Sequence, residues 1–215
     1  MGGYILKIVI IRKRWIINFF AIIIGLIIIF SLIRHYHYKA IATFLPKLPK
    51  TIVLDPGHGG IDPGAVSKSG LKEKDINLAI TFYLKDYLEE SGAKVILTRS
   101  RDEGLYSSSG SLSQKKTEDL KKRKEIIKKS DADLFVTIHL NSFPQAKYYG
   151  AQTFYSKDNE SGKILAECIQ EELIKTLDNE NKRTILSKDD VYIIKGLDIP
   201  TALVECGFLS NPNEE

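Results

Sequence analysis

Two hydrophobic patterns divide the chain. Residues 15–33 form a run of 19 residues without a charged side chain, in which only Asn18 and Ser31 are clearly polar. At about 1.5 Å rise per residue, a helix of this length spans roughly 28 Å, close to the thickness of the bilayer hydrocarbon core. Residues 51–215 instead alternate short apolar runs with amphipathic segments, which is the pattern of a folded domain.

The N-terminal run has basic residues on both sides. Three consecutive basic residues precede it and an arginine follows it. We therefore expect a basic tail over residues 1–14, a transmembrane anchor or uncleaved signal over residues 15–33, and a linker over residues 34–50. A cleaved signal peptide is the alternative, but the run is longer than the usual ~7–15 residues. An inside N-terminus would place the domain that follows outside the cytoplasm.

The hydrophobic pattern of residues 51–215, the body of the chain, predicts alternating strands and helices. Strands are predicted at the short β-branched and apolar runs, residues 51–55, 94–98, 134–139, 151–155, 191–194 and 201–205. Helices are predicted where apolar residues recur at helical spacing, residues 74–90, 117–130 and 160–177. Residues 103–116, rich in Ser and Gly, predict a long mobile loop. Ser210, Asn211 and Pro212 predict the beginning of another helix. This alternation predicts an α/β fold with a central, mostly parallel sheet flanked by helices.

Charge is distributed unevenly between the two parts. Eight of the 31 Lys and Arg residues lie in residues 1–50, where there is no acidic residue. Taking these eight from 31 leaves 23 basic against 27 acidic side chains in the body, a net charge of −4. This mildly acidic body has no sustained basic face, so we expect no nucleic-acid partner.

Four side chains are suited to metal binding or proton transfer: His58, Glu73, His139 and Glu205. His58, His139 and Glu205 lie at or just beyond predicted strand ends, and Glu73 lies at the start of the helix that follows the first strand. Because the carboxyl ends of parallel strands meet at one edge of a sheet, we expect these side chains to converge. Two imidazoles and one carboxylate are a known ligand set of catalytic zinc, with a fourth position open to water. The residues therefore predict a Zn²⁺ site formed by His58, Glu73 and His139. Glu205 is the candidate general base and acid.

Each of these residues, taken singly, also fits a structural role. A histidine at a strand end can serve as a hydrogen-bonded structural residue, and Glu73 can be a helix-start carboxylate. Glu205 can pair with a lysine. Asp55 and Asp62 are candidates either to orient a ligand imidazole or to cap a turn. The H-E-x-x-H motif is absent, which excludes the zincin type of metal site.

Four sequence blocks carry a family resemblance; they are IVLDPGHGGIDPGA, LKEKDINL, VTIHLNS and ALVECGFLSN. In this order they resemble the N-acetylmuramoyl-L-alanine amidases of the zinc amidase type 3 family, over residues 51–215. The resemblance implies hydrolysis of the amide between N-acetylmuramic acid and the L-alanine of the stem peptide in peptidoglycan. It also implies that His58, Glu73 and His139 are the zinc ligands and that Glu205 is the catalytic glutamate.

Finer features resemble the CwlD-type germination-specific branch of this family. These features are the short N-terminal hydrophobic segment, the sequence of residues 115–155 and the lack of added wall-binding repeats. The branch implies removal of stem peptides in spore cortex so that muramic δ-lactam forms, at the cell wall or in the forespore intermembrane space. In some members a lipoprotein partner assists zinc binding. The family continues beyond the Ser-Asn-Pro block into a final helix, which the domain over residues 51–215 is therefore expected to lack. Ser142 stands where the family often has alanine.

Three other functions stay open on the sequence. A metal-dependent peptidase acting on wall peptides would use the same ligand set. A glycosidase would use Glu73 and Glu205 as paired carboxylates, and it leaves both histidines unexplained. A truncated, inactive homologue would bind the wall or a partner without catalysis.

Overall fold

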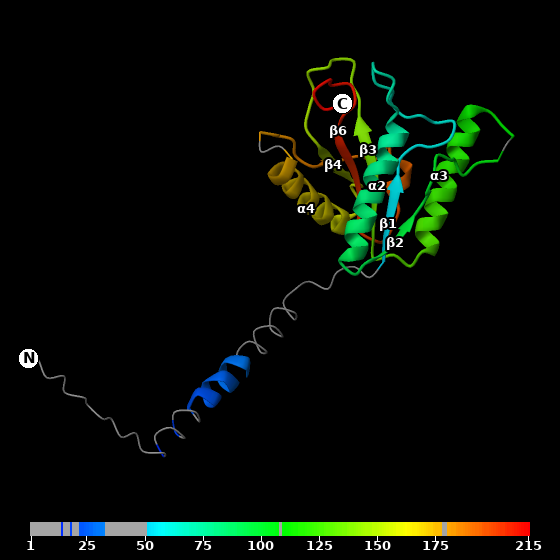
Figure 1. The fold of residues 1–215 in the computed structure, drawn as a ribbon. Helices are drawn as coiled ribbons and strands as arrows, with labels where there is room; N and C mark the ends of the chain where they lie inside the picture. The colour runs from blue at the N-terminus through cyan, green and yellow to red at the C-terminus, as the bar shows by residue number, and fades with distance from the viewer. Residues whose placement is uncertain (1–13, 15–17, 19–21, 33–50, 108, 178–179) are drawn as a thin grey trace, which may run out of the picture. The chain divides into compact units, whose positions relative to one another are not determined.

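The computed structural model describes residues 14, 18, 22–32, 51–107, 109–177 and 180–215. The chain divides into two compact units, residues 1–47 and 48–215. The second unit holds the sheet, the helices that cover it and the candidate site (Figure 1).

The second unit is built on one sheet, which among the described residues has six strands in the order β2-β1-β3-β6-β4-β5. The strands are β1 (Thr51–Pro56), β2 (Lys94–Leu97), β3 (Leu134–Asn141), β4 (Gln152–Tyr155), β5 (Leu186–Ser187) and β6 (Thr201–Phe208). β1 pairs in parallel with β2 and β3, and β3 pairs in parallel with β6. β4 runs antiparallel to β6, and β5 pairs in parallel with β4. The predicted α/β fold with a mostly parallel sheet is confirmed, and the antiparallel pairing makes the sheet mixed.

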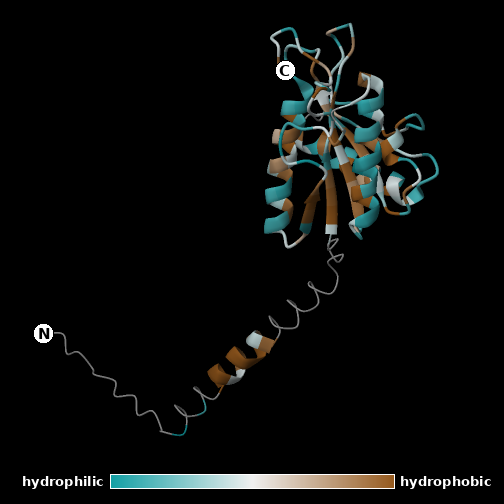
Figure 2. Ribbon diagram, turned by 90° about the vertical axis from the view of Figure 1, so that its right-hand side faces the viewer, coloured by the Kyte–Doolittle hydropathy of each residue, from teal (hydrophilic) through white to brown (hydrophobic). Residues whose placement is uncertain are grey.

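Helices cover both faces of this sheet (Figure 1). They are α2 (Glu73–Glu90), α3 (Leu112–Lys129), α4 (Glu160–Leu177) and the short 3-10 helix η1 (Tyr192–Ile194). Apolar side chains of α2 and α4 pack around Leu54 and Val204 on one face, whereas α3 and η1 contribute to the core around Phe135 on the other. Strands buried on both faces are typical of parallel sheets between helices. Figure 2 shows these hydrophobic strands between helices whose outer surfaces are hydrophilic.

Helix α3 begins at Leu112, so the prediction of a loop as far as residue 116 is wrong. The Oγ of Ser111 accepts from the N–H of Gln114 at 3.3 Å, and the Oε1 of Gln114 accepts from the N–H of Ser111 at 2.7 Å. This capping box satisfies two backbone donors at the helix start. Its Ser-x-x-Gln pattern lies inside a stretch whose composition alone indicates a loop. The earlier start places Lys116 in the first turns of α3.

One further prediction is wrong in detail. Residues 191–194 do not form a strand, since Tyr192–Ile194 form η1, with Ile193 and Ile194 buried in the core. A short apolar run has no periodicity that separates a strand from a buried helical turn. Residues 212–214 form a turn at the position where a helix start is predicted. The side chain of Asn211 accepts from the N–H of Asn213 at 2.9 Å, and its backbone carbonyl oxygen accepts from the N–H of Glu215 at 2.9 Å, as at the first turn of a helix. The two-residue strand β5 was not predicted at all.

The N-terminal unit is described at residues 14, 18 and 22–32, which are helical. Its exposed large apolar side chains are Ile22, Ile24, Leu26, Ile27, Ile28, Ile29, Phe30 and Leu32. In the part of the chain that the structure describes, we find no helix with both the length and the hydropathy to cross a membrane. The predicted anchor (15–33) is described only in part, and the linker (34–50) and the tail before residue 14 lie outside the described residues.

Candidate metal centre

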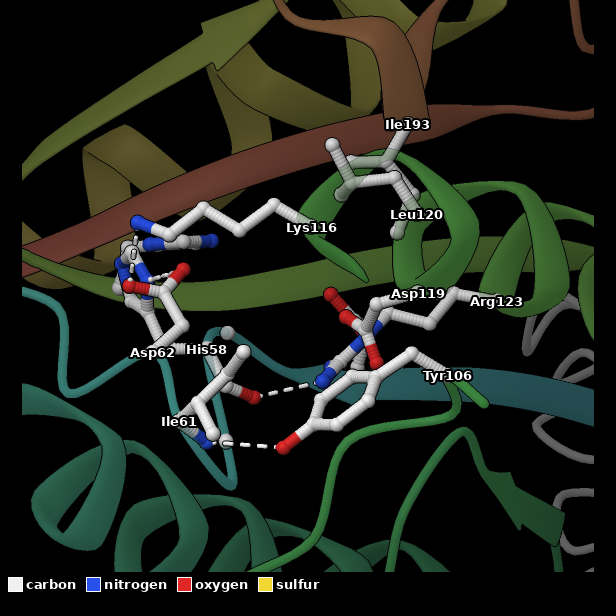
Figure 3. A pocket seen from close by; sticks show the side chains of 13 residues that line it. His58, Ile61, Asp62, Tyr106, Lys116, Asp119, Leu120, Arg123 and Ile193 are labelled. Atoms are coloured by element: carbon white, nitrogen blue, oxygen red, sulfur yellow. Dashed lines mark hydrogen bonds and ion pairs between the residues drawn. The ribbon is translucent and has the colours of Figure 1, made fainter. Parts of the chain in front are cut away.

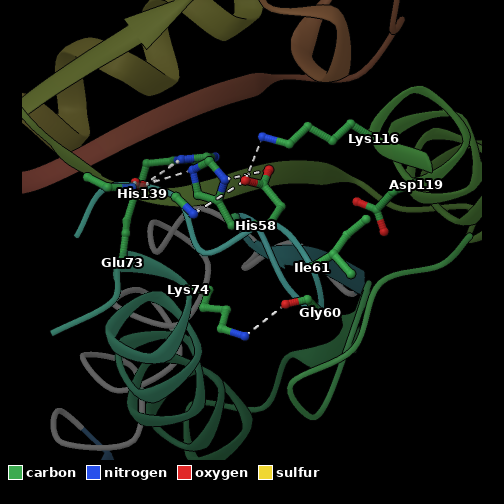
Figure 4. A network of polar contacts seen from close by, with 12 residues as sticks. His58, Gly60, Ile61, Glu73, Lys74, Lys116, Asp119 and His139 are labelled. Atoms are coloured by element: carbon green, nitrogen blue, oxygen red, sulfur yellow. Dashed lines mark hydrogen bonds and ion pairs between the residues drawn. The ribbon is translucent and has the colours of Figure 1, made fainter. Parts of the chain in front are cut away.

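Three of the four candidate side chains converge at the carboxyl edge of the sheet. His58 lies just beyond β1, His139 lies near the end of β3, and Glu73 is the first residue of α2. Each offers one ligand atom, and these atoms all lie within 4.8 Å of one another. In Figure 4 the carboxylate of Glu73 contacts both imidazoles. The structure therefore confirms that these three residues converge, as the sequence predicted.

Glu73 is the centre of this group. Its Oε1 lies 3.0 Å from Nδ1 of His139 and 3.2 Å from Nε2 of His58. The same oxygen accepts from the backbone N–H of Leu140 at 3.1 Å, and Oε2 accepts from that of Ala65 at 2.8 Å. The side chain is almost fully buried. Backbone donors therefore fix the carboxylate in place before any ion binds.

Two glycines leave the space that the ligand side chains occupy. A Cβ at Gly57 would lie 2.3 Å from the ring of His139. A Cβ at Gly64 would lie 2.5 Å from Oε2 of Glu73 and 2.7 Å from Cδ2 of His58, and Gly64 has a φ of 67°. Glycine adopts this left-handed conformation without steric cost. The backbone thus forms a cradle that fits two imidazoles and a carboxylate around one cation.

Two buried arginines hold the turn that carries His58. Arg123 donates to the carbonyl oxygens of Pro56 at 2.9 Å and of His58 at 2.6 Å. Arg99 donates to the carbonyls of Pro56 at 2.9 Å and of Gly57 at 3.0 Å. His58 has a φ of 64°, which for a residue with a Cβ costs about 1–3 kcal/mol. The guanidinium hydrogen bonds offset this strain and fix the backbone of the ligand.

The charge of Arg123 is balanced by Asp55 at 2.8 Å and Asp119 at 2.6 Å. Burial alone would raise the pKa of Asp55, but Arg123 and the hydroxyls of Thr137 and Thr98 hold that pKa below its usual value. Asp55 therefore belongs to this network, and the suggestion that it orients a ligand imidazole is wrong. Arg123 and Arg99 were not singled out from the sequence, because a charged residue in a polar stretch normally faces solvent.

Asp62 has the orienting position instead. Its Oδ2 lies 2.9 Å from Nδ1 of His58, which leaves Nε2 of the same ring facing Glu73. Its Oδ1 lies 2.7 Å from Nζ of Lys116. A carboxylate in this position fixes the ring orientation and the tautomer of a ligating histidine.

The group stabilises positive charge. Burial lowers the pKa of His58, but hydrogen bonds and charges from Asp62 and Glu73 outweigh it and raise that pKa to about 9. Burial raises the pKa of Glu73, but His139 and His58 hold it well below its usual range. A histidine must be neutral to bind a metal, so a divalent cation would take the place of the imidazolium proton.

Glu205 lies beside the ligand group and is not part of it. It is the partner of His139 across the β3–β6 ladder, whose register shifts just after this pair. The side chain is 8% exposed, and its Oε2 has no hydrogen-bond partner among the described residues. Burial raises the pKa of Glu205. This carboxyl group therefore holds a proton more readily than a surface glutamate does, as proton transfer requires.

Two imidazoles and a carboxylate at the carboxyl edge of an α/β sheet define a candidate metal-dependent hydrolase. The profile of the family described as N-acetylmuramoyl-L-alanine amidase matches residues 52–215. The chain therefore belongs to the N-acetylmuramoyl-L-alanine amidase family, as the resemblance of its four sequence blocks predicted. It therefore has the enzyme class of this family, that of an N-acetylmuramoyl-L-alanine amidase. This finding argues against the peptidase and the glycosidase alternatives.

The relatives point to the same branch. The chain is 43% identical over 171 residues to the germination-specific N-acetylmuramoyl-L-alanine amidase of Bacillus subtilis (strain 168), covering 79% of this chain and 71% of that protein. It is similar to the CwlD amidase of Clostridioides difficile, solved in complex with the GerS lipoprotein, with a TM-score of 0.75 and 55% identity over 77% of this chain and 85% of that one. An N-acetylmuramoyl-L-alanine amidase of Clostridium difficile 630 gives a TM-score of 0.66 and 30% identity over 78% and 84% of the two chains.

Proposed function

We propose that this amidase is zinc-dependent, with His58, Glu73 and His139 as the ligands of one Zn²⁺ ion. The observation that carries the proposal is that these residues, far apart in the sequence, bring their ligand atoms within 4.8 Å of one another. When bound, zinc supplies polarisation of the scissile carbonyl and a lower pKa for the attacking water. Three protein ligands would leave a fourth position for that water.

Glu205 carries the proton in this mechanism. Its unpartnered Oε2 accepts the proton that the attacking water loses, and then donates it to the nitrogen of the departing L-alanine. Burial keeps bulk water from competing for this oxygen, and it brings the pKa of the carboxyl group closer to neutrality. Asp62 holds His58 in the tautomer that directs Nε2 toward the ion.

The relatives support a biological setting for this activity. Similarity to a germination-specific amidase supports removal of stem peptides in spore cortex, where muramic δ-lactam then forms. The GerS complex of a similar amidase supports a lipoprotein partner for this chain. The exposed apolar side chains of residues 22–32 support an anchor over residues 15–33. The three consecutive basic residues before this run support an inside N-terminus, with the catalytic domain on the extracytoplasmic side.

Removal of the metal tests this function. Chelation should abolish turnover of purified peptidoglycan, and addition of zinc should restore it, because all three ligands remain in place. The products should carry new L-alanine amino termini, measured by amine labelling and mass spectrometry. New reducing ends or cut peptide cross-links would contradict an amidase, and full activity in chelator would contradict the zinc.

A further inference from the structure

A cavity of about 150 Å³ opens beside His58 and His139. Most of its wall is apolar, formed by Ile61, Tyr106, Leu120 and Ile193 (Figure 3). One water molecule needs roughly 10–15 Å³ of such a cavity, so this space has ample room for a small aliphatic group. Its mainly apolar wall suits an aliphatic side chain such as the methyl group of alanine.

The charged side chains that line this cavity differ in how many of their hydrogen-bonding groups are already paired within the protein. Arg123 is fully buried, and each of its three guanidinium nitrogens donates to a protein acceptor. Asp119 accepts from Arg123 at 2.6 Å and from the N–H of Leu105 at 2.6 Å. These two residues are therefore structural parts of the wall.

Lys116 is different. It reaches from α3 across the cavity toward Asp62 (Figure 3), and its side chain is 45% exposed. Its Nζ lies 2.7 Å from Oδ1 of Asp62. An ammonium group has three donors, and Asp62 takes one of them. Because Asp62 already holds the side chain in place, a further acceptor would bind with little additional loss of side-chain entropy.

The two sides of the proposed substrate differ in charge. The N-acetylated glycan strand is neutral, whereas the stem peptide carries carboxylates. We propose that Lys116 binds the carboxylate of the residue that follows L-alanine in the stem peptide, while the alanine methyl group occupies the apolar cavity. This inference rests on the proposed amidase function. Lys116 is then a specificity-determining residue, and it selects stem peptides in which this carboxylate is free and not amidated.

The test compares two peptidoglycan strands of the same length, whose stem peptides carry D-isoglutamate or D-isoglutamine after L-alanine. The zinc-loaded full chain should cleave the carboxylate strand with a kcat/KM about tenfold higher, the effect of one charge-assisted hydrogen bond. Lys116→Met should reduce this ratio to about one. Lys121→Met is the matched control, since Lys121 is exposed on the same helix and does not line the cavity, and it should keep the tenfold ratio.

Zinc content is measured for all three proteins. Loss of the preference in Lys116→Met with unchanged zinc supports the inference. Equal cleavage of both strands by the wild type overturns the inference about Lys116 and leaves the amidase function standing. A preference that survives Lys116→Met overturns the inference in the same way. Loss of zinc with an equal fall on both strands also overturns it, because Lys116 would then act only on His58 through Asp62. Cleavage of neither strand by the wild type refutes the proposed function itself.

Discussion

Replacement of Glu205 by glutamine should lower kcat by about 10²–10⁴-fold and leave the metal bound. Glutamine has the same shape as glutamate, but its amide cannot take the proton of the attacking water. The Oε2 of Glu205 has no hydrogen-bond partner among the described residues, so the substitution breaks no observed bond at that atom. Turnover of peptidoglycan and zinc per chain, measured on the same preparation, check both halves of this expectation.

Glu167→Gln is the control for this experiment. Glu167 is an exposed residue of α4, so the same chemical change there should leave activity and zinc unaltered. Loss of zinc in Glu205→Gln would make Glu205 a metal ligand. Unchanged kcat would remove it from the mechanism altogether.

Arg123→Met should lower the free energy of unfolding by about 3–5 kcal/mol at pH 7. Methionine fills much of the volume, but it leaves the buried carboxylate of Asp55 without its cation and the carbonyl of His58 without its donor. Denaturant unfolding of the full chain measures the change. Lys122→Met is the control, because the Lys122–Glu118 pair is half-exposed and its loss should cost only about 0.2–1 kcal/mol.

The pH dependence distinguishes a lost ion pair from lost packing. In the wild type the pKa of Asp55 in the folded state lies below its unfolded value of 3.8, so its contribution is full above that pH and is lost as the pH falls. Without Arg123 the effect of burial dominates and raises this pKa above the unfolded value. The charged form is then the destabilised one, so the deficit of the variant should grow as pH rises from about 4 to 7. A deficit that does not change with pH would mean that lost packing explains it.

The sequence predicted the site better than it predicted the element boundaries. His58 follows β1, and His139 and Glu205 lie in the carboxyl-terminal halves of β3 and β6, so one topological rule brings them to the same edge. Glu73 returns to that edge because α2 begins there. The strands themselves are predictable because their apolar runs are buried between two layers of helices.

The supporting residues were harder to predict. Arg123 lies in a polar stretch with few apolar residues, and its burial depends on Asp55, 68 positions away, which no local pattern reveals. Asp55 and Asp62 have similar sequence contexts, and only the path of the turn after β1 decides which one faces His58. Lys116 lies on α3, and not in a loop, because the capping box at Ser111 starts this helix earlier than composition indicates.

Metal content of the purified full chain tests the central claim most directly. Elemental mass spectrometry after gel filtration should find about one zinc per chain in the wild type. The Glu73→Gln variant should contain little or no zinc, because the substitution removes the anionic ligand between the two imidazoles. A Glu73→Gln protein that is folded and still carries stoichiometric zinc would contradict the assignment of this site.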